Sequence, residues 1–382
     1  MSLRFGAAAL LLVAARTAAA SEPLPTETAQ VTQPTQPRIE AAPDAKAEAK
    51  EDREPRPEIE LSGRVFFRAA ATKVDAGDFS TDLELASARL EARRQWRRLR
   101  VVVEVELARK ARLKDAFVRW RKGPLRVQAG QFKEPGSNVE LESTFDLPVV
   151  DRGTVHDLLD RFAIGGRRPG VQFELAGGGR LDPSLRVGVF QGIDARGDLL
   201  AESGSSGLGL AARAEISPGG IGLGLFGGWR ALEPIDGGGV RRLGMVGADV
   251  TMQRKLGRTR LRIWLDGTVG ENAIDHDQTD SCHATFAAGR AIVAFAVGAR
   301  RSGARYVEPY VHAGAVDPDL DVGDDQVVEA GLGANIGRWD RMRLSLELNR
   351  RGVATRNAVP FLGGDVALVS RSAILVQLAT RL

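Results

Sequence analysis

Short runs in which apolar and polar residues alternate recur along this chain from Ile59 onward. In the clearest hairpin, residues 116–120 and 125–129, Ala, Val, Trp and Leu occupy alternate positions with Arg and Gln between most of them. A Lys-Gly-Pro turn separates the two runs. Successive side chains of a β-strand point to opposite faces, so this pattern predicts two strands with one apolar and one cationic face.

The number and spacing of these runs restrict the fold further. About sixteen of them occur over roughly 325 residues, more than a single soluble sandwich usually contains. Compact turns such as 177–179 and 217–220 alternate with longer polar connections such as 194–206 and 271–283. Alternating short and long connections are typical of outer-membrane barrels. The sequence therefore predicts an all-β fold, a transmembrane antiparallel β-barrel of about 16 strands over residues 58–382.

The N-terminal region predicts export. A basic start, an apolar run over residues 5–15 and an Ala-Ala-Ala stretch before Ser21 are typical of a signal peptide, here residues 1–20. The run is too short for a membrane-spanning helix, which needs about 20 residues. Residues 21–57 are rich in Pro, Thr, Gln and mixed charge, which predicts a flexible periplasmic linker. Peptidoglycan binding and trimerisation are alternative roles for this linker.

Charge excludes one class of partner and suggests another. Most of the 53 basic residues are Arg, and 49 acidic residues accompany them along the strands. A nucleic-acid-binding protein would instead concentrate its bases in a patch interleaved with aromatic residues. The Arg content reflects either the base composition of the genome or a lumen that binds oxyanions, for which the guanidinium fork is well suited.

Five short motifs stand out in the first half of the chain: Ser87-Ala88-Arg89-Leu90, Asp115-Ala116-Phe117, Gly130-Gln131-Phe132-Lys133-Glu134-Pro135, Glu140-Leu141-Glu142-Ser143 and Asp151-Arg152. Together they resemble motifs of a known family, the phosphate-selective porins of the O and P type. The resemblance implies a passive channel in the outer membrane of a Gram-negative bacterium, surrounded by outer-membrane lipid and assembled as a homotrimer. It also implies that inorganic phosphate, polyphosphate or other small anions pass through. No cofactor and no enzymatic activity are expected.

Basic side chains on the polar parity of the strands and in the long connection are the candidates for the pore lining. Rings of Arg and Lys would replace part of an anion's hydration and hold it weakly enough for release. The predicted lining residues are Arg64, Arg68, Arg89, Arg100, Arg119, Arg121, Arg126, Lys133 and Arg152. Glu104, Glu106, Glu140 and Asp151 are expected to pair with some of them. The alternative is a structural or adhesive barrel with a closed pore, whose loops bind a partner.

The connection over residues 134–165 is predicted to fold into the barrel and narrow it. Pro135 and Gly136 would turn the chain at the barrel mouth, and acidic side chains would bond wall arginines. Arg152 and Arg161 would present charge to an anion, and the apolar anchors would be Leu141, Phe145, Leu147, Val149 and Val150. An external loop packed on its neighbours is the alternative.

Other motifs have plainer interpretations. Residues 222–227 match the dinucleotide-binding pattern, but they lie in an alternating run with no helix after them, which predicts a strand. Residues 317–321 place three Asp two apart without the remaining ligands of a calcium loop, so either loose calcium binding or a solvated loop is expected. Residues 275–283 contain suitable transition-metal ligands in no familiar spacing. The single cysteine, Cys282, precludes an intramolecular disulfide.

Overall fold

The computed structural model describes residues 59–382 with interruptions. The residues outside the description are 1–58, 76, 109–110, 162–163, 195–206, 234–239, 272–284, 299–302, 322–325 and 354–369. The predicted signal peptide and linker lie outside the described residues. Residues 275–283, which contain transition-metal ligand types in no familiar spacing, also lie outside the described residues.

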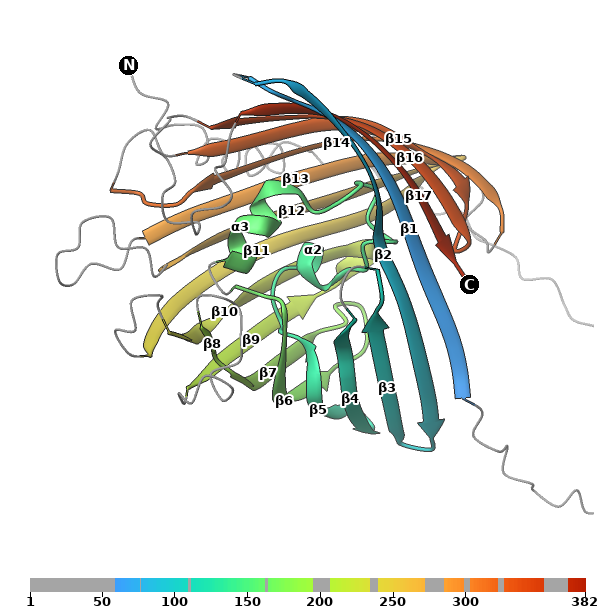
Figure 1. The fold of residues 1–382 in the computed structure, drawn as a ribbon. Helices are drawn as coiled ribbons and strands as arrows, with labels where there is room; N and C mark the ends of the chain where they lie inside the picture. Colours follow the sequence, from blue (N-terminus) through green and yellow to red (C-terminus); the bar gives the residue numbers. More distant parts are fainter. Residues whose placement is uncertain are drawn as a thin grey trace, which may run out of the picture. The chain divides into compact units, whose positions relative to one another are not determined.

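In the described part of the chain, sixteen long antiparallel strands close into a barrel (Figure 1). They are β1 (Ile59–Val74), β2 (Phe79–Trp96), β3 (Leu99–Glu106), β4 (Arg112–Lys122), β5 (Leu125–Lys133), β6 (Arg167–Ala176), β7 (Ser184–Gln191), β9 (Leu208–Ile216), β10 (Ile221–Glu233), β11 (Arg241–Leu256), β12 (Thr259–Glu271), β13 (Thr285–Gly298), β14 (Arg305–Asp317), β15 (Val327–Arg338), β16 (Met342–Val353) and β17 (Arg371–Arg381). A two-residue strand, β8 (Ile193–Asp194), pairs in parallel with β10. The barrel closes where β1 pairs with β17 as well as with β2.

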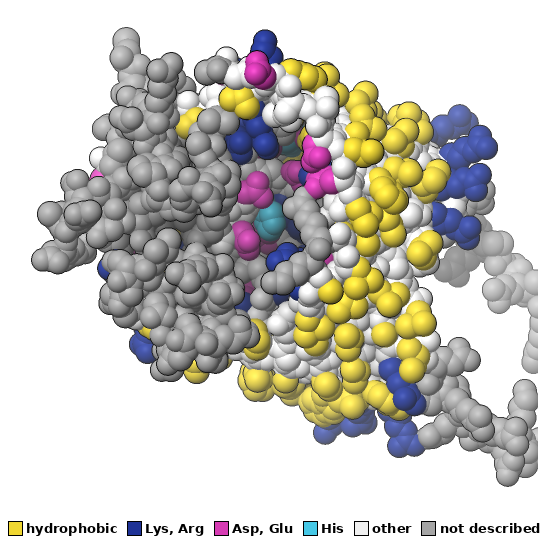
Figure 2. All heavy atoms as spheres, viewed as in Figure 1, with side chains coloured by type: hydrophobic (Ala, Val, Ile, Leu, Met, Phe, Trp, Pro, Cys, Tyr) yellow, Lys and Arg dark blue, Asp and Glu magenta, His cyan; other side chains and the backbone are white. Residues whose placement is uncertain are grey.

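Alternating side chains give the barrel an apolar outer face and a polar inner face. In β14, Tyr306, Glu308 and Tyr310 are buried in the interior, whereas Val307 and Val311 are about half exposed on the outside. Figure 2 shows the resulting band of hydrophobic side chains around the wall. A barrel that spans a bilayer needs such an apolar band where its wall contacts the lipid chains. The predicted fold class is confirmed.

The hairpin that first indicated strands is formed by β4 and β5, and both strands extend past the alternating runs. Val118 faces outward and is exposed, while Gln128 is buried on the lumen side. Gly123, in the turn between them, has a φ of 58°, a conformation that glycine adopts without strain. Backbone pairing continues beyond the apolar positions because strand ladders do not depend on which side chains they carry. Residues 222–227 lie within β10, as predicted.

Residues 134–166 connect β5 to β6 through the interior of the barrel. This inner loop contains two helices that were not predicted, α2 (Asn138–Leu141) and α3 (Gly153–Arg161), both visible inside the barrel in Figure 1. Val139 and Leu147 of the loop pack with Trp264 and Ile292 of the wall. The predicted inward path of the connection is confirmed. None of the helices in the described residues is long and apolar enough to cross a bilayer.

A second apolar cluster holds α3. Val155 and Leu159 are almost fully buried and pack against Phe286, Val316 and Val327, which belong to β13, β14 and β15. The loop therefore lies against the wall formed by β11 to β17. The inward faces of β3 to β5, on the other side of the lumen, carry four of the eight predicted pore arginines, Arg100, Arg119, Arg121 and Arg126.

Candidate functional site

The strongest polar contact between the inner loop and the wall is a buried charge network around Arg290. Its guanidinium donates to Glu140 Oε1 at 2.6 Å, to Asp266 Oδ2 at 2.8 Å and to Ser137 Oγ at 3.3 Å. His156 Nδ1 lies 2.6 Å from the second oxygen of Glu140. Burial alone would raise the pKa of Glu140, but Arg290 and His156 outweigh it and hold that pKa well below its ordinary value. The loop is therefore attached through an ionised carboxylate.

Further wall side chains bind the backbone of the loop. Arg262 donates to Asp146 O at 2.6 Å, and Arg343 donates to Phe145 O at 3.1 Å. Asn335 donates to Pro148 O at 2.7 Å. Both arginines are buried, Arg262 with 3% and Arg343 with 2% of its surface exposed, so an anion in the lumen does not contact them. Cations on this wall position the loop.

Two of the predicted lining residues, Lys133 and Arg152, also hold the loop. Lys133 Nζ donates to three successive carbonyl oxygens, those of residues 140, 141 and 142, at 2.7 to 3.1 Å. Arg152 donates to Val139 O at 2.8 Å and to Thr144 Oγ1 at 3.2 Å. Burial lowers the pKa of Arg152 to about 10, against the opposing effect of Glu140. The side chain of Arg161 lies outside the described residues.

Arg64, Arg68 and Arg89 occupy the lumen wall beside the loop, each with an acidic partner. Arg64 pairs with Glu104 and donates to Ser143 Oγ of the loop at 2.8 Å. Arg68 lies 3.2 Å from Asp151 Oδ2 of the loop. Arg89 contacts Glu104 at 3.4 Å and Glu106 at 3.1 Å. The structure thus places every predicted acidic partner beside a predicted cation, and Arg152 lies 4.0 Å from Glu140.

The remaining four predicted residues gather at the barrel end that carries the turns 97–98 and 123–124. They line a cavity of about 620 Å³ between β2, β3, β4 and β5. Its charged lining residues are all basic, namely Arg97, Arg98, Arg100, Arg119, Arg121, Lys122 and Arg126. We call this the basic cavity. Arg97, Arg98 and Lys122 were not among the predicted residues because they lie in or beside a turn, where alternation no longer assigns a face.

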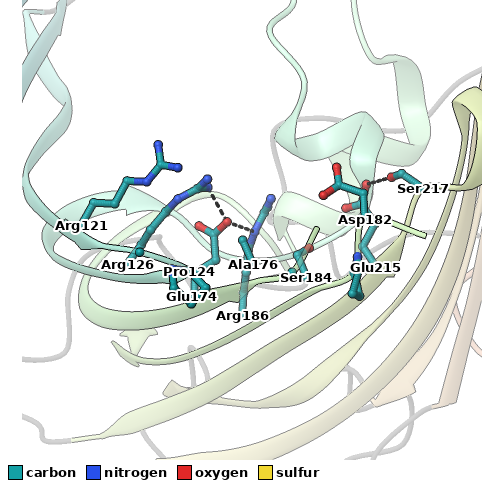
Figure 3. A pocket seen from close by; sticks show the side chains of 13 residues that line it. Arg121, Pro124, Arg126, Glu174, Ala176, Asp182, Ser184, Arg186, Glu215 and Ser217 are labelled. Atoms are coloured by element: carbon teal, nitrogen blue, oxygen red, sulfur yellow. Dashed lines mark hydrogen bonds and ion pairs between the residues drawn. The ribbon is translucent and has the colours of Figure 1, made fainter. Parts of the chain in front are cut away.

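A neighbouring cavity of about 390 Å³ shares Arg121 and Arg126 but contains acidic residues as well (Figure 3). Glu174 lies between Arg126 at 2.6 Å and Arg186 at 3.9 Å, and the figure shows the three side chains directed toward one another. Arg126 is therefore partly neutralised. Arg121 is exposed and forms no ion pair with the other described residues. The positive charge is greatest on the Arg97 to Arg121 side.

A family model described as phosphate-selective porin O and P matches residues 66–287, more than half of the chain. The chain belongs to this family. It is therefore a porin, a channel-forming barrel of the outer membrane and not a member of an enzyme family, and the resemblance drawn from its motifs is confirmed. A comparison with curated proteins finds no match to this porin.

Solved structures show the same fold. The anion-selective porin from Comamonas acidovorans aligns with a TM-score of 0.56 at 12% identity, covering 85% of this porin and 100% of that chain. OprB of Pseudomonas putida gives 0.57 at 11%, covering 85% and 94%. The outer-membrane channel DcaP of Acinetobacter baumannii gives 0.56 at 11%, covering 85% and 97%. At these identities the likeness establishes the sixteen-stranded barrel alone.

The described residues of the porin contain no group of three His, Cys, Asp or Glu side chains placed to hold a metal ion. Asp317, Asp319 and Asp321 are described, but they make other contacts. Gln326 Nε2 donates to Asp317 at 3.0 Å, and the backbone N–H of Asp321 donates to Asp319 at 3.0 Å. The calcium interpretation of residues 317–321 has no geometric support in this part of the chain.

Proposed function

We propose that this porin is a passive channel selective for small oxyanions such as phosphate or polyphosphate. The observation that carries the proposal is the basic cavity at one end of the lumen, whose seven charged lining residues are all basic. A cavity lined by one sign of charge raises the local concentration of the opposite ion. The family description names phosphate selectivity, and a structural neighbour is an anion-selective porin.

The mechanism follows from the two kinds of cation along the lumen. In the basic cavity an anion meets Arg119, whose hydrogen-bond partner is the neutral Gln128, and Arg121, which forms no ion pair with the other described residues. It is attracted to these two cations without displacing an internal ion pair. Beside the loop, Arg64 and Arg89 are already paired with Glu104. There an anion competes with a fixed carboxylate, which makes binding weak and allows release. Weak successive sites let an anion enter and leave.

Planar-bilayer recording tests this proposal. Under a potassium chloride gradient, the reversal potential should have the sign of an anion-selective pore, and added phosphate should lower the chloride current by occupying the same cations. Cation selectivity would contradict the proposal. A folded barrel with no single-channel steps would instead favour the structural or adhesive alternative.

We further infer that the porin reaches the outer membrane through the periplasm and assembles as a homotrimer, with residues 1–20 removed and residues 21–57 as a linker. The signal-peptide pattern supports export, and family membership supports the trimer. Mass spectrometry of the outer-membrane fraction should find a chain that begins near Ser21. Cross-linking in native membranes should give a trimer. An intact Met1 in a cytosolic protein would contradict the export route.

A further inference from the structure

Two arginines face each other on the outer surface of the barrel. Arg305 opens β14 and Arg338 ends β15, and the two residues are direct cross-strand partners. Both are exposed, and both lie on the outward parity, which Val307 of β14 and Ile336 of β15 share. Side chains opposite each other on one face of an antiparallel pair lie close together, and like charges at such positions destabilise the pair. An anion between or above the two side chains would offset this repulsion.

A third arginine joins this pair from the adjacent turn. The backbone N–H of Arg341 donates to Arg338 O at 3.1 Å, and its exposed side chain lies beside Gly303, close to the start of β14. Asp340 is the carboxylate nearest in sequence. Among the described residues, no ion pair or side-chain hydrogen bond joins any of the three guanidinium groups to Asp340 or to another acid. We call Arg305, Arg338 and Arg341 the outer arginine cluster.

The surface beside the cluster is apolar and continuous with the hydrophobic band. Val307, Ile336, Met342 and Leu344 occupy the next outward positions on β14, β15 and β16, and they are 45% to 57% exposed. Figure 2 shows Lys and Arg side chains gathered past the end of that band. This end carries short turns, such as the one at residues 339–341, which in outer-membrane barrels face the periplasm.

We propose that the outer arginine cluster binds the phosphate of an anionic phospholipid in the inner leaflet of the outer membrane. Guanidinium groups donate in a planar fork that matches phosphate oxygens, and the three arginines would share one headgroup. The acyl chains would lie along Val307, Ile336 and Leu344. A free phosphate ion would use the arginines but leave this apolar surface without a role, so the combination favours a lipid. This site is separate from the lumen and from the proposed conduction.

Native mass spectrometry of the assembled porin tests the proposal, with phosphatidylglycerol and phosphatidylcholine offered in equal amounts. The test variant is Arg305→Gln with Arg338→Gln. The control is Arg254→Gln, which removes an outward, exposed arginine of β11 whose cross-strand partner is Leu261. Each basic residue near an anionic lipid surface contributes about 1 kcal/mol, so the double variant should bind phosphatidylglycerol about 30-fold more weakly than the parent.

The parent should retain phosphatidylglycerol in preference to phosphatidylcholine, and the control should behave like the parent. Equal retention of phosphatidylglycerol by parent and double variant overturns the site, as does an equal loss in the control. Release of the lipid by millimolar inorganic phosphate would identify a general anion site and overturn the lipid assignment. Ion selectivity of the double variant should match the parent, because the cluster lies outside the lumen, and this match establishes that the barrel is folded.

Discussion

Replacing Arg119 and Arg121 together by glutamate should lower the anion preference of the channel. Both side chains line the basic cavity, and the cavity has no acidic lining residue to offset their charge. Arg119 donates to Gln128 Oε1 at 2.7 Å, which is a neutral partner, so no ion pair neutralises its charge. Each reversal changes the lining charge by two units. The cavity would retain a net positive lining, weakened by more than half.

The expected magnitude follows from Coulomb's law with screening. At about 10 Å in 0.1 M salt, one unit charge shifts the energy of a monovalent ion by about 0.15 kcal/mol. Four units give about 0.6 kcal/mol for each ion, which disfavours an anion about threefold and favours a cation about threefold. The permeability ratio of chloride over potassium should therefore fall about eightfold. In 0.01 M salt the screening length is about 30 Å, and the same estimate gives about 50-fold.

Reversal potentials in planar bilayers, measured at both salt concentrations, provide the readout. The matched control is Arg254→Glu with Arg338→Glu, which makes the same change of charge at exposed, outward-facing positions. That control should conduct with the parent's selectivity. The reasoning is refuted if the Arg119 and Arg121 variant keeps the parent's permeability ratio, or if the control shifts as far. An effect that does not grow at low salt would also show that electrostatic attraction is not the cause.

Three further predictions concern the inner loop and the barrel wall. Arg290→Met should destabilise the loop by about 3 kcal/mol, because buried Asp266 loses its cation and Glu140 loses its link to the wall, keeping only His156 and Arg152 of the loop. Single-channel recordings should then show a larger, noisier conductance. The pKa of Glu140 lies well below its ordinary 4.5, so the carboxylate holds the loop fully above pH 4.5 and releases it only as the pH falls through the depressed pKa. Conductance should therefore stay constant from neutral pH to about 4.5 and rise only below it. A rise in conductance at higher pH would contradict this role of Glu140. Gly130→Ala should reduce the refolding yield in a heat-modifiability gel assay, because the φ of Gly130 is 125° and an added Cβ would lie 2.2 Å from a backbone oxygen. Gly123→Ala is the control: its added Cβ would have no atom within 4 Å, so the barrel should lose only about 1 kcal/mol of stability.

The sequence alone determined the barrel and the direction of its side chains. A period of two assigns each strand residue to a face, so the outward position of Val118 and the inward position of Arg119 follow from local geometry. The long connection after β5 was recognisable by its length and its acidic, Pro-containing composition. Its two short helices were not, because a four-residue and a nine-residue helix inside a barrel are stabilised by packing on the wall more than by propensity.

Tertiary structure decided which cations remain available to an ion. Lys133 and Arg126 both lie on β5 in the lumen, yet Lys133 is used by three loop carbonyls and Arg126 is paired with Glu174, 48 residues away. The pairing of β5 with β6 places Glu174 directly opposite Arg126, and the path of the inner loop brings its carbonyls to Lys133. Arg119 and Arg121 form no ion pair with the other described residues, because the residue opposite Arg119 is the neutral Gln128 and the residue opposite Arg121 is another cation, Arg126. Alternation determines to which face a side chain points, but its partner depends on which strands pair, in which register, and on where the inner loop runs.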